Sequence, residues 1–170
     1  MNHGEDDSVW YFAYGSNMDP ARLFDARLAP AGVACFERVL GRLDDWVLTF
    51  DKPSAYFHGA AAANLAERPG SYVLGVLNRI PKQGLEVLDH YENVASGQYE
   101  RVTVRILRPE SNEYVAAVTY IARNNLDPRL KPCAAYLAHL LAGHDILPNS
   151  YIEQLKSLTV CDEIIDQHST

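Results

Sequence analysis

Apolar residues recur at strand-like spacing through most of the chain and at helix-like spacing in a few shorter stretches. Residues 9–13 form an apolar and aromatic run with the composition of a buried strand. Residues 32–51 are rich in β-forming side chains and predict two strands that break near residues 41–45. Residues 71–80 predict a further strand, so β structure is expected to dominate the first half of the protein.

The second half adds a hairpin, and an alanine-rich stretch before it could be read as either helix or strand. Residues 99–108 and 114–122 alternate apolar and polar positions on either side of a polar turn, which predicts a hairpin. Residues 59–65 contain four consecutive alanines, which favour a helix by propensity. This run is short, lies among strands and precedes the turn pair Pro69-Gly70, so we interpret it as a strand whose small side chains permit a close approach.

Helical periods appear at about four places. Residues 20–28 follow an Asp-Pro helix start, and residues 85–91 place apolar side chains three apart. Residues 132–141 begin with proline and precede a glycine, and a last helix follows Ser150. These elements predict an α+β fold: a curved, largely antiparallel, barrel-like mixed sheet of about six or seven strands, flanked by about four helices.

Length and composition narrow the class of protein. The chain has 170 residues, of which 48% are hydrophobic and 22% charged, as in an ordinary globular domain. We expect one domain over residues 1–170, with flexible tails at 1–8 and 161–170. The net charge of -7 disfavours nucleic acid and anionic membranes as partners. No apolar run approaches the length of a membrane span, and the acidic N-terminus does not resemble a secretory signal.

Cysteines and histidines show no framework or metal pattern. Cys35, Cys133 and Cys161 are odd in number and far apart, which argues against disulfides and suits a reducing compartment such as the cytoplasm. His139 and His144 are five apart, whereas ligands on one helix face need a spacing of three or four. We therefore expect no metal site.

The strongest local feature is the loop that follows the first strand. Tyr14, Gly15, Ser16 and Asn17 separate the strand from the helix start, and a glycine there permits a tight turn. Backbone N–H groups at the entry to a helix favour an anion or a developing oxyanion. The loop is thus a small-molecule site in outline, although a plain strand–helix turn accounts for it equally well.

Several segments, in order from about residue 10 to residue 155, resemble landmarks of the γ-glutamylcyclotransferase family. The matching segments are Tyr11-Phe12-Ala13-Tyr14-Gly15-Ser16-Asn17-Met18, His58-Gly59, Gly75-Val76-Leu77, Leu88-Asp89-His90-Tyr91-Glu92-Asn93-Val94, Tyr99, Val118-Thr119-Tyr120, Pro132, Tyr136, Gly143, Leu147-Pro148 and Tyr151. Each match is weak alone, and together they are specific. One departure is Asn93, where the family more often has glycine, and this residue could alter the turn that aims Glu92.

The resemblance implies an enzyme that cyclises a γ-glutamyl amino acid or peptide to 5-oxoproline, in the setting of glutathione metabolism, without metal or organic cofactor. It implies Glu92 as general acid and base, with Asp89 as the second choice. It implies Tyr14, Gly15, Ser16, Asn17 and Tyr120 as substrate-binding residues, with the Tyr120 hydroxyl orienting Glu92 or the substrate. Arg22 is interpreted as a charge on a helix face rather than a carboxylate clamp.

Two alternatives remain open at this stage. The same type of enzyme could act on a γ-glutamyl amine or remove a γ-glutamyl protecting group in biosynthesis. A protein of another class could keep the pocket as a non-catalytic binding or sensing module. In each case the expected partner is a small molecule, and the sequence leaves open whether the chain forms a homodimer.

Overall fold

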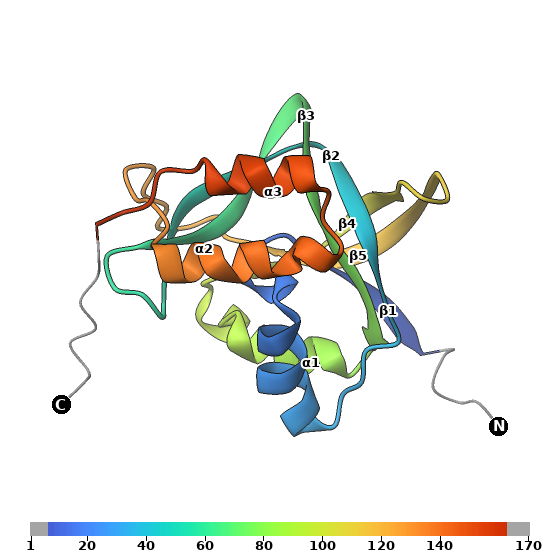
Figure 1. Ribbon diagram of the computed structural model, residues 1–170. Coiled ribbons are helices and arrows are strands. Elements are labelled where there is room, and N and C mark those ends of the chain that lie inside the picture. The colour runs from blue at the N-terminus through green and yellow to red at the C-terminus, as the bar shows by residue number, and fades with distance from the viewer. Residues whose placement is uncertain (1–6, 163–170) are drawn as a thin grey trace.

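Five strands form a closed barrel in the computed structural model, which describes residues 7–162 (Figure 1). The strands are β1 (Ser8–Ala13), β2 (Glu37–Pro53), β3 (Ala61–Pro81), β4 (Glu100–Arg108) and β5 (Glu113–Ile121), in the spatial order β1-β3-β2-β4-β5. Every neighbouring pair is antiparallel except β1 and β5, which pair in parallel at Tyr11 and Val118 and close the barrel. The expected α+β class and largely antiparallel, barrel-like sheet are confirmed, as is the β4–β5 hairpin.

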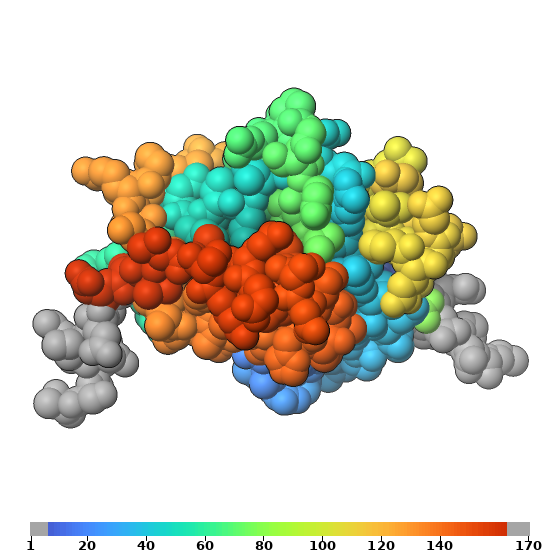
Figure 2. Space-filling view, turned by 45° about the horizontal axis from the view of Figure 1, so that its top comes forward, coloured from blue at the N-terminus to red at the C-terminus, as the bar shows by residue number. Residues whose placement is uncertain are grey.

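The expected six or seven strands are wrong, because local turn signals bend two long strands without ending them. β2 and β3 stay paired over most of their length, with shifts of register after Asp44 and after Thr49. Asp45 and Gly70 adopt left-handed backbone conformations, with φ of 65° and 82°, and the Gly70 N–H donates to Asp45 Oδ1 at 2.9 Å. The bend of β3 forms the green tip that projects at the top of Figures 1 and 2.

A pair of facing glycines makes room for an aromatic side chain inside the barrel. Gly41 of β2 lies opposite Gly75 of β3, and the Phe12 side chain, which is fully buried, packs over both. A Cβ on Gly75 would lie 2.6 Å from the Phe12 ring and a Cβ on Gly41 would lie 3.1 Å from it. Real Cβ atoms do not come as close as 2.6 Å, and 3.1 Å is already tight, so the two glycines make room for the Phe12 ring of β1.

Four helices pack outside the barrel, as expected. They are the π-helix η2 (Ala21–Leu28) and the α-helices α1 (Gly84–Tyr91), α2 (Ala134–Leu141) and α3 (Asn149–Lys156). Helices α2 and α3 lie side by side in Figure 1 and cover one face of the molecule in Figure 2. Helices η2 and α1 lie against each other, next to the loop after β1. Within residues 7–162, no helix is long and apolar enough to cross a membrane.

The remaining expectations on local structure have mixed outcomes. The alanine-rich stretch is a strand, since residues 61–65 belong to β3. Flexible tails were expected at 1–8 and 161–170, and residues 1–6 and 163–170 of these lie outside the part of the chain that the structure describes. Of the remaining tail residues, Ser8 belongs to β1, and the Cys161 N–H donates to Pro132 O. All three cysteines are free thiols.

Candidate active site

The loop after β1 carries a glycine that neighbouring side chains require. A Cβ on Gly15 would lie 3.1 Å from Ala63 Cβ and 3.1 Å from Tyr136 Oη, so a larger residue would require both neighbours to shift by a few tenths of an ångström. No hydrogen bond within the described chain engages the backbone N–H groups of Gly15, Ser16 and Asn17. These three residues line a pocket, where such groups can donate to a ligand oxygen.

Glu92 enters the same pocket from the end of α1. It is the residue directly after the helix, and its N–H donates to Leu88 O at 2.8 Å. The next residue, Asn93, turns the chain with φ of 52° and ψ of 45°, a left-handed conformation in which glycine and asparagine are the favoured residues. The asparagine therefore preserves the turn that a glycine would make and keeps Glu92 directed into the pocket.

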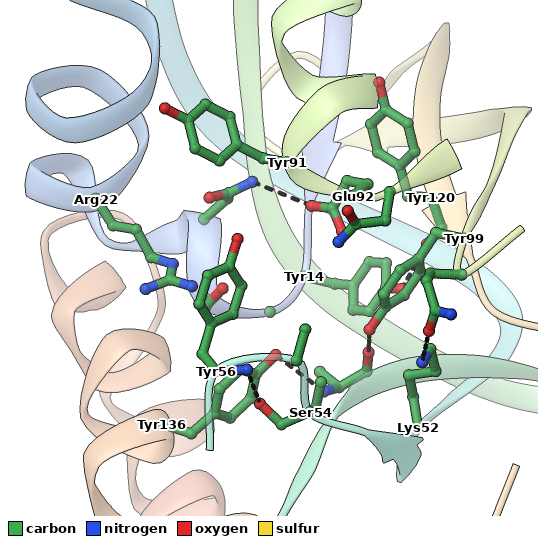
Figure 3. Close-up of a pocket in the computed structure, with 18 of the residues that line it drawn as sticks. Tyr14, Arg22, Lys52, Ser54, Tyr56, Tyr91, Glu92, Tyr99, Tyr120 and Tyr136 are labelled. Carbon is green, nitrogen blue, oxygen red and sulfur yellow. Dashed lines mark hydrogen bonds between the residues drawn. The ribbon is translucent and has the colours of Figure 1, made fainter. Parts of the chain in front are cut away.

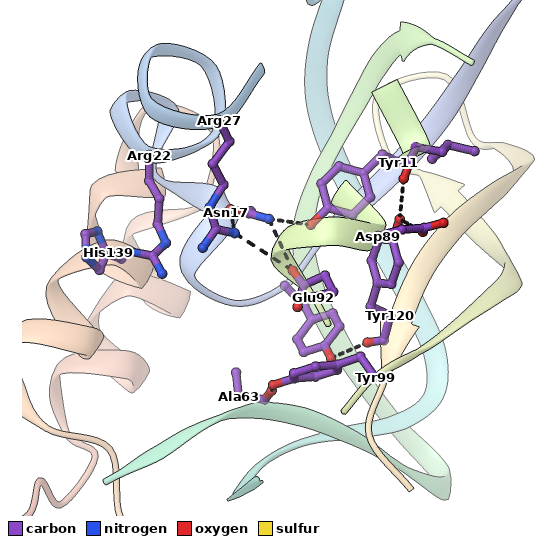
Figure 4. Close-up of polar contacts among 12 residues, drawn as sticks. Tyr11, Asn17, Arg22, Arg27, Ala63, Asp89, Glu92, Tyr99, Tyr120 and His139 are labelled. Carbon is purple, nitrogen blue, oxygen red and sulfur yellow. Dashed lines mark hydrogen bonds and ion pairs between the residues drawn. The ribbon is translucent and has the colours of Figure 1, made fainter. Parts of the chain in front are cut away.

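Asn17 connects the loop to Glu92 and to η2 (Figure 4). Its Nδ2 group donates to Tyr11 Oη at 3.0 Å and lies 3.5 Å from Glu92 Oε1. Its Oδ1 atom accepts a hydrogen bond from Arg27 at 2.8 Å, and the same guanidinium lies 3.9 Å from Glu92. The Asn17 side chain is buried and hydrogen-bonded at both ends, so it positions the protein groups around it.

Burial dominates the electrostatics of Glu92. Only 18% of its side chain is exposed, and the loss of solvent raises the pKa of the carboxyl above its ordinary value. The positive charges of Arg27 and then Arg22 act in the opposite direction and hold the pKa down in part. A carboxyl group whose pKa is raised in this way is a better base than an ordinary glutamate and can return the proton that it accepts.

The pocket joins all six residues that the sequence predicts for the site (Figure 3). It is lined by these six, Tyr14, Gly15, Ser16, Asn17, Glu92 and Tyr120, and by Tyr11, Arg22, Arg27, Lys52, Pro53, Ser54, Ala55, Tyr56, Ala62, Ala63, Tyr91, Asn93, Gln98, Tyr99, Thr119 and Tyr136. The wall combines aromatic rings with one carboxylate and several cations. Within residues 7–162, no cluster of His, Cys, Asp or Glu side chains could hold a metal ion.

Tyr120 lies in the pocket wall, but its hydroxyl has a different partner from the one expected. The hydroxyl donates to Asp89 Oδ1 at 2.7 Å and not to Glu92. Arg101 donates to both oxygens of the same Asp89 carboxylate, which is absent from the pocket lining. Asp89 is therefore bound in an ion pair away from the pocket, and Glu92 is the carboxylate that lines it. The expectation that the Tyr120 hydroxyl orients Glu92 is wrong.

Arg22 also differs from its expected place on a helix face, because it lines the pocket. Its guanidinium lies over the Tyr56 ring at 5.0 Å and contacts His139 at 3.5 Å, while its buried Nε has no partner within the described residues. The i→i+5 hydrogen bonds of η2 wind it more loosely than an α-helix, which brings Arg22 nearer to Arg27, five residues on. An α-helical reading of the sequence does not place these two residues together.

Three tyrosines for which the sequence predicted no role also line the pocket, beside the predicted Tyr14 and Tyr120. Tyr11, predicted in a buried strand and within a segment that resembles the family, received no role of its own, yet its hydroxyl accepts from Asn17. Tyr99 donates to Ala63 O at 3.0 Å, and the Ala63 N–H donates to the Tyr136 hydroxyl at 2.9 Å. Burial raises the pKa of all three hydroxyls, with the nearby charge of Glu92 adding to the effect, so they remain neutral.

The fold and the pocket together define a class: an α+β barrel protein with a pocket built around one half-buried glutamate. Comparison with known proteins agrees. The model of the AIG2-like family matches residues 72–155. The γ-glutamylcyclotransferases of Homo sapiens and Mus musculus are 31% and 30% identical to this chain over 158 residues, which cover 91% of the chain and 80% of each relative. A solved structure of a γ-glutamyl cyclotransferase, 30% identical, superposes with a TM-score of 0.79 over 92% of this chain and 90% of that chain.

The chain therefore belongs to the γ-glutamylcyclotransferase family.

Proposed function

We propose that the protein converts a γ-glutamyl amino acid or peptide into 5-oxoproline and releases the amine to which the glutamyl group was linked. The α-amine of the glutamyl unit attacks the γ-carbonyl carbon of the same unit, a five-membered lactam forms, and the amide C–N bond breaks. Because both reacting groups belong to one molecule, folding the substrate into a reactive conformation supplies much of the rate enhancement. The membership in the cyclotransferase family supports this reaction class.

Glu92 is the proposed proton carrier. The substrate amine is an ammonium ion at neutral pH, so Glu92 first takes one proton and exposes the nitrogen lone pair. The carboxylic acid then returns that proton to the departing nitrogen as the tetrahedral intermediate collapses. The second surplus proton of the ring nitrogen passes to the released amine, which leaves as an ammonium ion. The single observation that carries the assignment is a half-buried carboxyl, 18% exposed and with a raised pKa, that lines the pocket.

The loop residues and Arg22 are the proposed substrate-binding groups. The free N–H groups of Gly15, Ser16 and Asn17 suit the oxyanion that develops on the γ-carbonyl oxygen, because backbone donors held in place need no reorganisation. The guanidinium of Arg22, with an unpaired buried Nε, suits the glutamyl α-carboxylate. Tyr14 and Tyr120 form part of the pocket wall. The Tyr14 hydroxyl donates a hydrogen bond to Tyr120 O, and the Tyr120 hydroxyl donates one to Asp89, so neither hydroxyl is free to donate to the substrate.

An assay for 5-oxoproline over a small substrate panel tests the proposal. The panel contains γ-glutamyl amino acids, γ-glutamyl peptides and γ-glutamyl alkylamines at equal concentrations, with product measured by mass spectrometry. We expect product from the amino acid or peptide conjugates. Product from the alkylamines alone would favour the other leaving-group class, and no product from any compound would favour a binding module.

A further inference from the structure

Lys52 is a buried lysine at the end of β2 whose charge no protein carboxylate balances. The residue is 4% exposed, and its ammonium donates to Gln98 Oε1 at 2.6 Å and to Pro53 O at 3.2 Å. No carboxylate within residues 7–162 forms an ion pair with it. An ammonium has three donors, so one remains for another acceptor. Burial also lowers the pKa of this amine, which reflects the cost of holding the charge there.

The position of Lys52 is separate from the other cations of the pocket. Figure 3 shows Lys52 beside Tyr99 on one side, with Arg22 on the opposite side and Glu92 between the two sides. Arg22 and Arg27 lie near each other on η2, and Arg27 also contacts Glu92. The pocket therefore has a positive centre at each end, within a protein whose net charge is -7.

The number of positive centres matches one class of γ-glutamyl compound. A γ-glutamyl amino acid carries two carboxylates, one on the glutamyl unit and one on the departing amino acid, with the scissile amide between them. A γ-glutamyl alkylamine carries only the first. With the glutamyl carboxylate assigned to the Arg22 end, the departing group extends toward the Lys52 end, where a carboxylate would complete the hydrogen bonding of the ammonium.

We propose that Lys52 is a specificity-determining residue that binds the carboxylate of the departing amino acid. This assignment rests on the proposed cyclotransferase function and names its substrate class. Without such a ligand, a neutral side chain of similar length would fill the site without the cost of an unbalanced buried charge. Gln98 holds the ammonium in place by its side-chain oxygen, and Tyr99, whose ring centroid lies 5.8 Å from the ammonium, forms the adjoining wall.

A matched pair of substrates tests the proposal. γ-Glutamyl-L-alanine and γ-glutamyl-L-alaninamide differ only in the charge of the departing group. A charge-assisted hydrogen bond contributes roughly 1.5–3 kcal/mol, so the parent protein is expected to favour the acid about 10- to 100-fold in kcat/KM. In Lys52→Met this preference should fall to within about threefold, mainly through KM of the acid, while kcat/KM for the amide, which has only a neutral acceptor for the ammonium, falls by a much smaller factor.

Two further variants separate recognition from packing. Lys82→Met removes an exposed lysine and should leave the preference unchanged. Gln98→Glu keeps Lys52 but places a carboxylate beside its ammonium, and should also abolish the preference for the acid, which decides the matter if Lys52→Met does not fold. Equal loss on both substrates in Lys52→Met, or a preference that survives both pocket variants, would overturn the proposal.

The activity of the unaltered protein on the two substrates distinguishes the role of Lys52 from the cyclotransferase function. Equal efficiency on the acid and the amide would overturn the role of Lys52 and leave the cyclotransferase function standing. Absence of 5-oxoproline from both compounds, and from the wider panel above, would overturn the cyclotransferase function and with it the role of Lys52.

Discussion

The side-chain amide of Asn17 lies 3.5 Å from the carboxylate of Glu92 and connects the loop after β1 to the end of α1, 75 residues away in sequence. The other end of the amide accepts a hydrogen bond from Arg27. Asn17 thus lies between a cation and the carboxylate, and the guanidinium stays 3.9 Å from Glu92. A direct bidentate pair would depress the pKa of the carboxyl strongly and weaken it as a base.

Replacement of this amide should damage turnover more than binding. In Asn17→Ala, Glu92 and Tyr11 lose a shared donor, and Arg27 is left with an unmet buried donor. We expect kcat to fall about 10- to 100-fold with KM within a few-fold of the parent, and stability to fall by about 1–3 kcal/mol. Steady-state kinetics and urea unfolding measure the two effects. Asn149→Ala, at the exposed start of α3, is the matched control and should change neither. A change confined to KM would contradict a positioning role.

Arg27 should set the acidic limb of the pH profile. Its positive charge favours the ionised form of Glu92, so removal of that charge in Arg27→Gln raises the pKa of Glu92 further above its ordinary value. The rise of kcat/KM with pH, which reports the free enzyme, should then move to higher pH. The exposed Arg123→Gln serves as control. An acidic limb that stays in place in the folded Arg27→Gln protein would show that Glu92 is not the group titrated.

Glu92 should also cost stability at neutral pH. The pKa of Glu92 is higher in the folded protein than in the unfolded chain, so between these two pKa values the folded protein binds more protons. The free energy of unfolding therefore decreases as pH rises through that interval. Glu92→Gln removes the effect and should be more stable than the parent at pH 7, with the difference disappearing below the ordinary pKa of a glutamate. Unfolding by urea at several pH values measures it. A difference that is independent of pH would contradict this account.

The sequence predicts those elements whose signals are local. The strand at 9–13, the four helices and the hairpin follow from periodicity, turn residues and caps, and the structure contains them all. The number of strands cannot be predicted from local signals, because Asp45 and Gly70 are residues typical of turns and yet lie inside β2 and β3. Whether such residues end a strand or bend it depends on pairing with a distant partner, which a local pattern does not contain.

The residues of the pocket likewise divide into those with a local sequence signal and those without one. A glutamate at the end of a helix and a glycine between a strand and a helix are visible locally, and both Glu92 and Gly15 line the pocket. Arg22 and Arg27 lie near each other because η2 is a π-helix. Lys52 belongs to β2, which extends past the predicted strand end at residue 51, and its ammonium donates to Gln98. These placements depend on the winding of a helix and on contacts between distant segments, so periodicity alone cannot supply them.

The most direct test of the central claim is the turnover number of Glu92→Gln with a γ-glutamyl substrate that the parent protein cyclises. The amide keeps the shape of the side chain but cannot take the proton of the substrate ammonium. We expect kcat to fall about 10²- to 10⁴-fold with KM little changed, while Glu86→Gln, an exposed position on the same helix, keeps parental activity. A folded Glu92→Gln protein whose kcat stays within a few-fold of the parent would contradict the account.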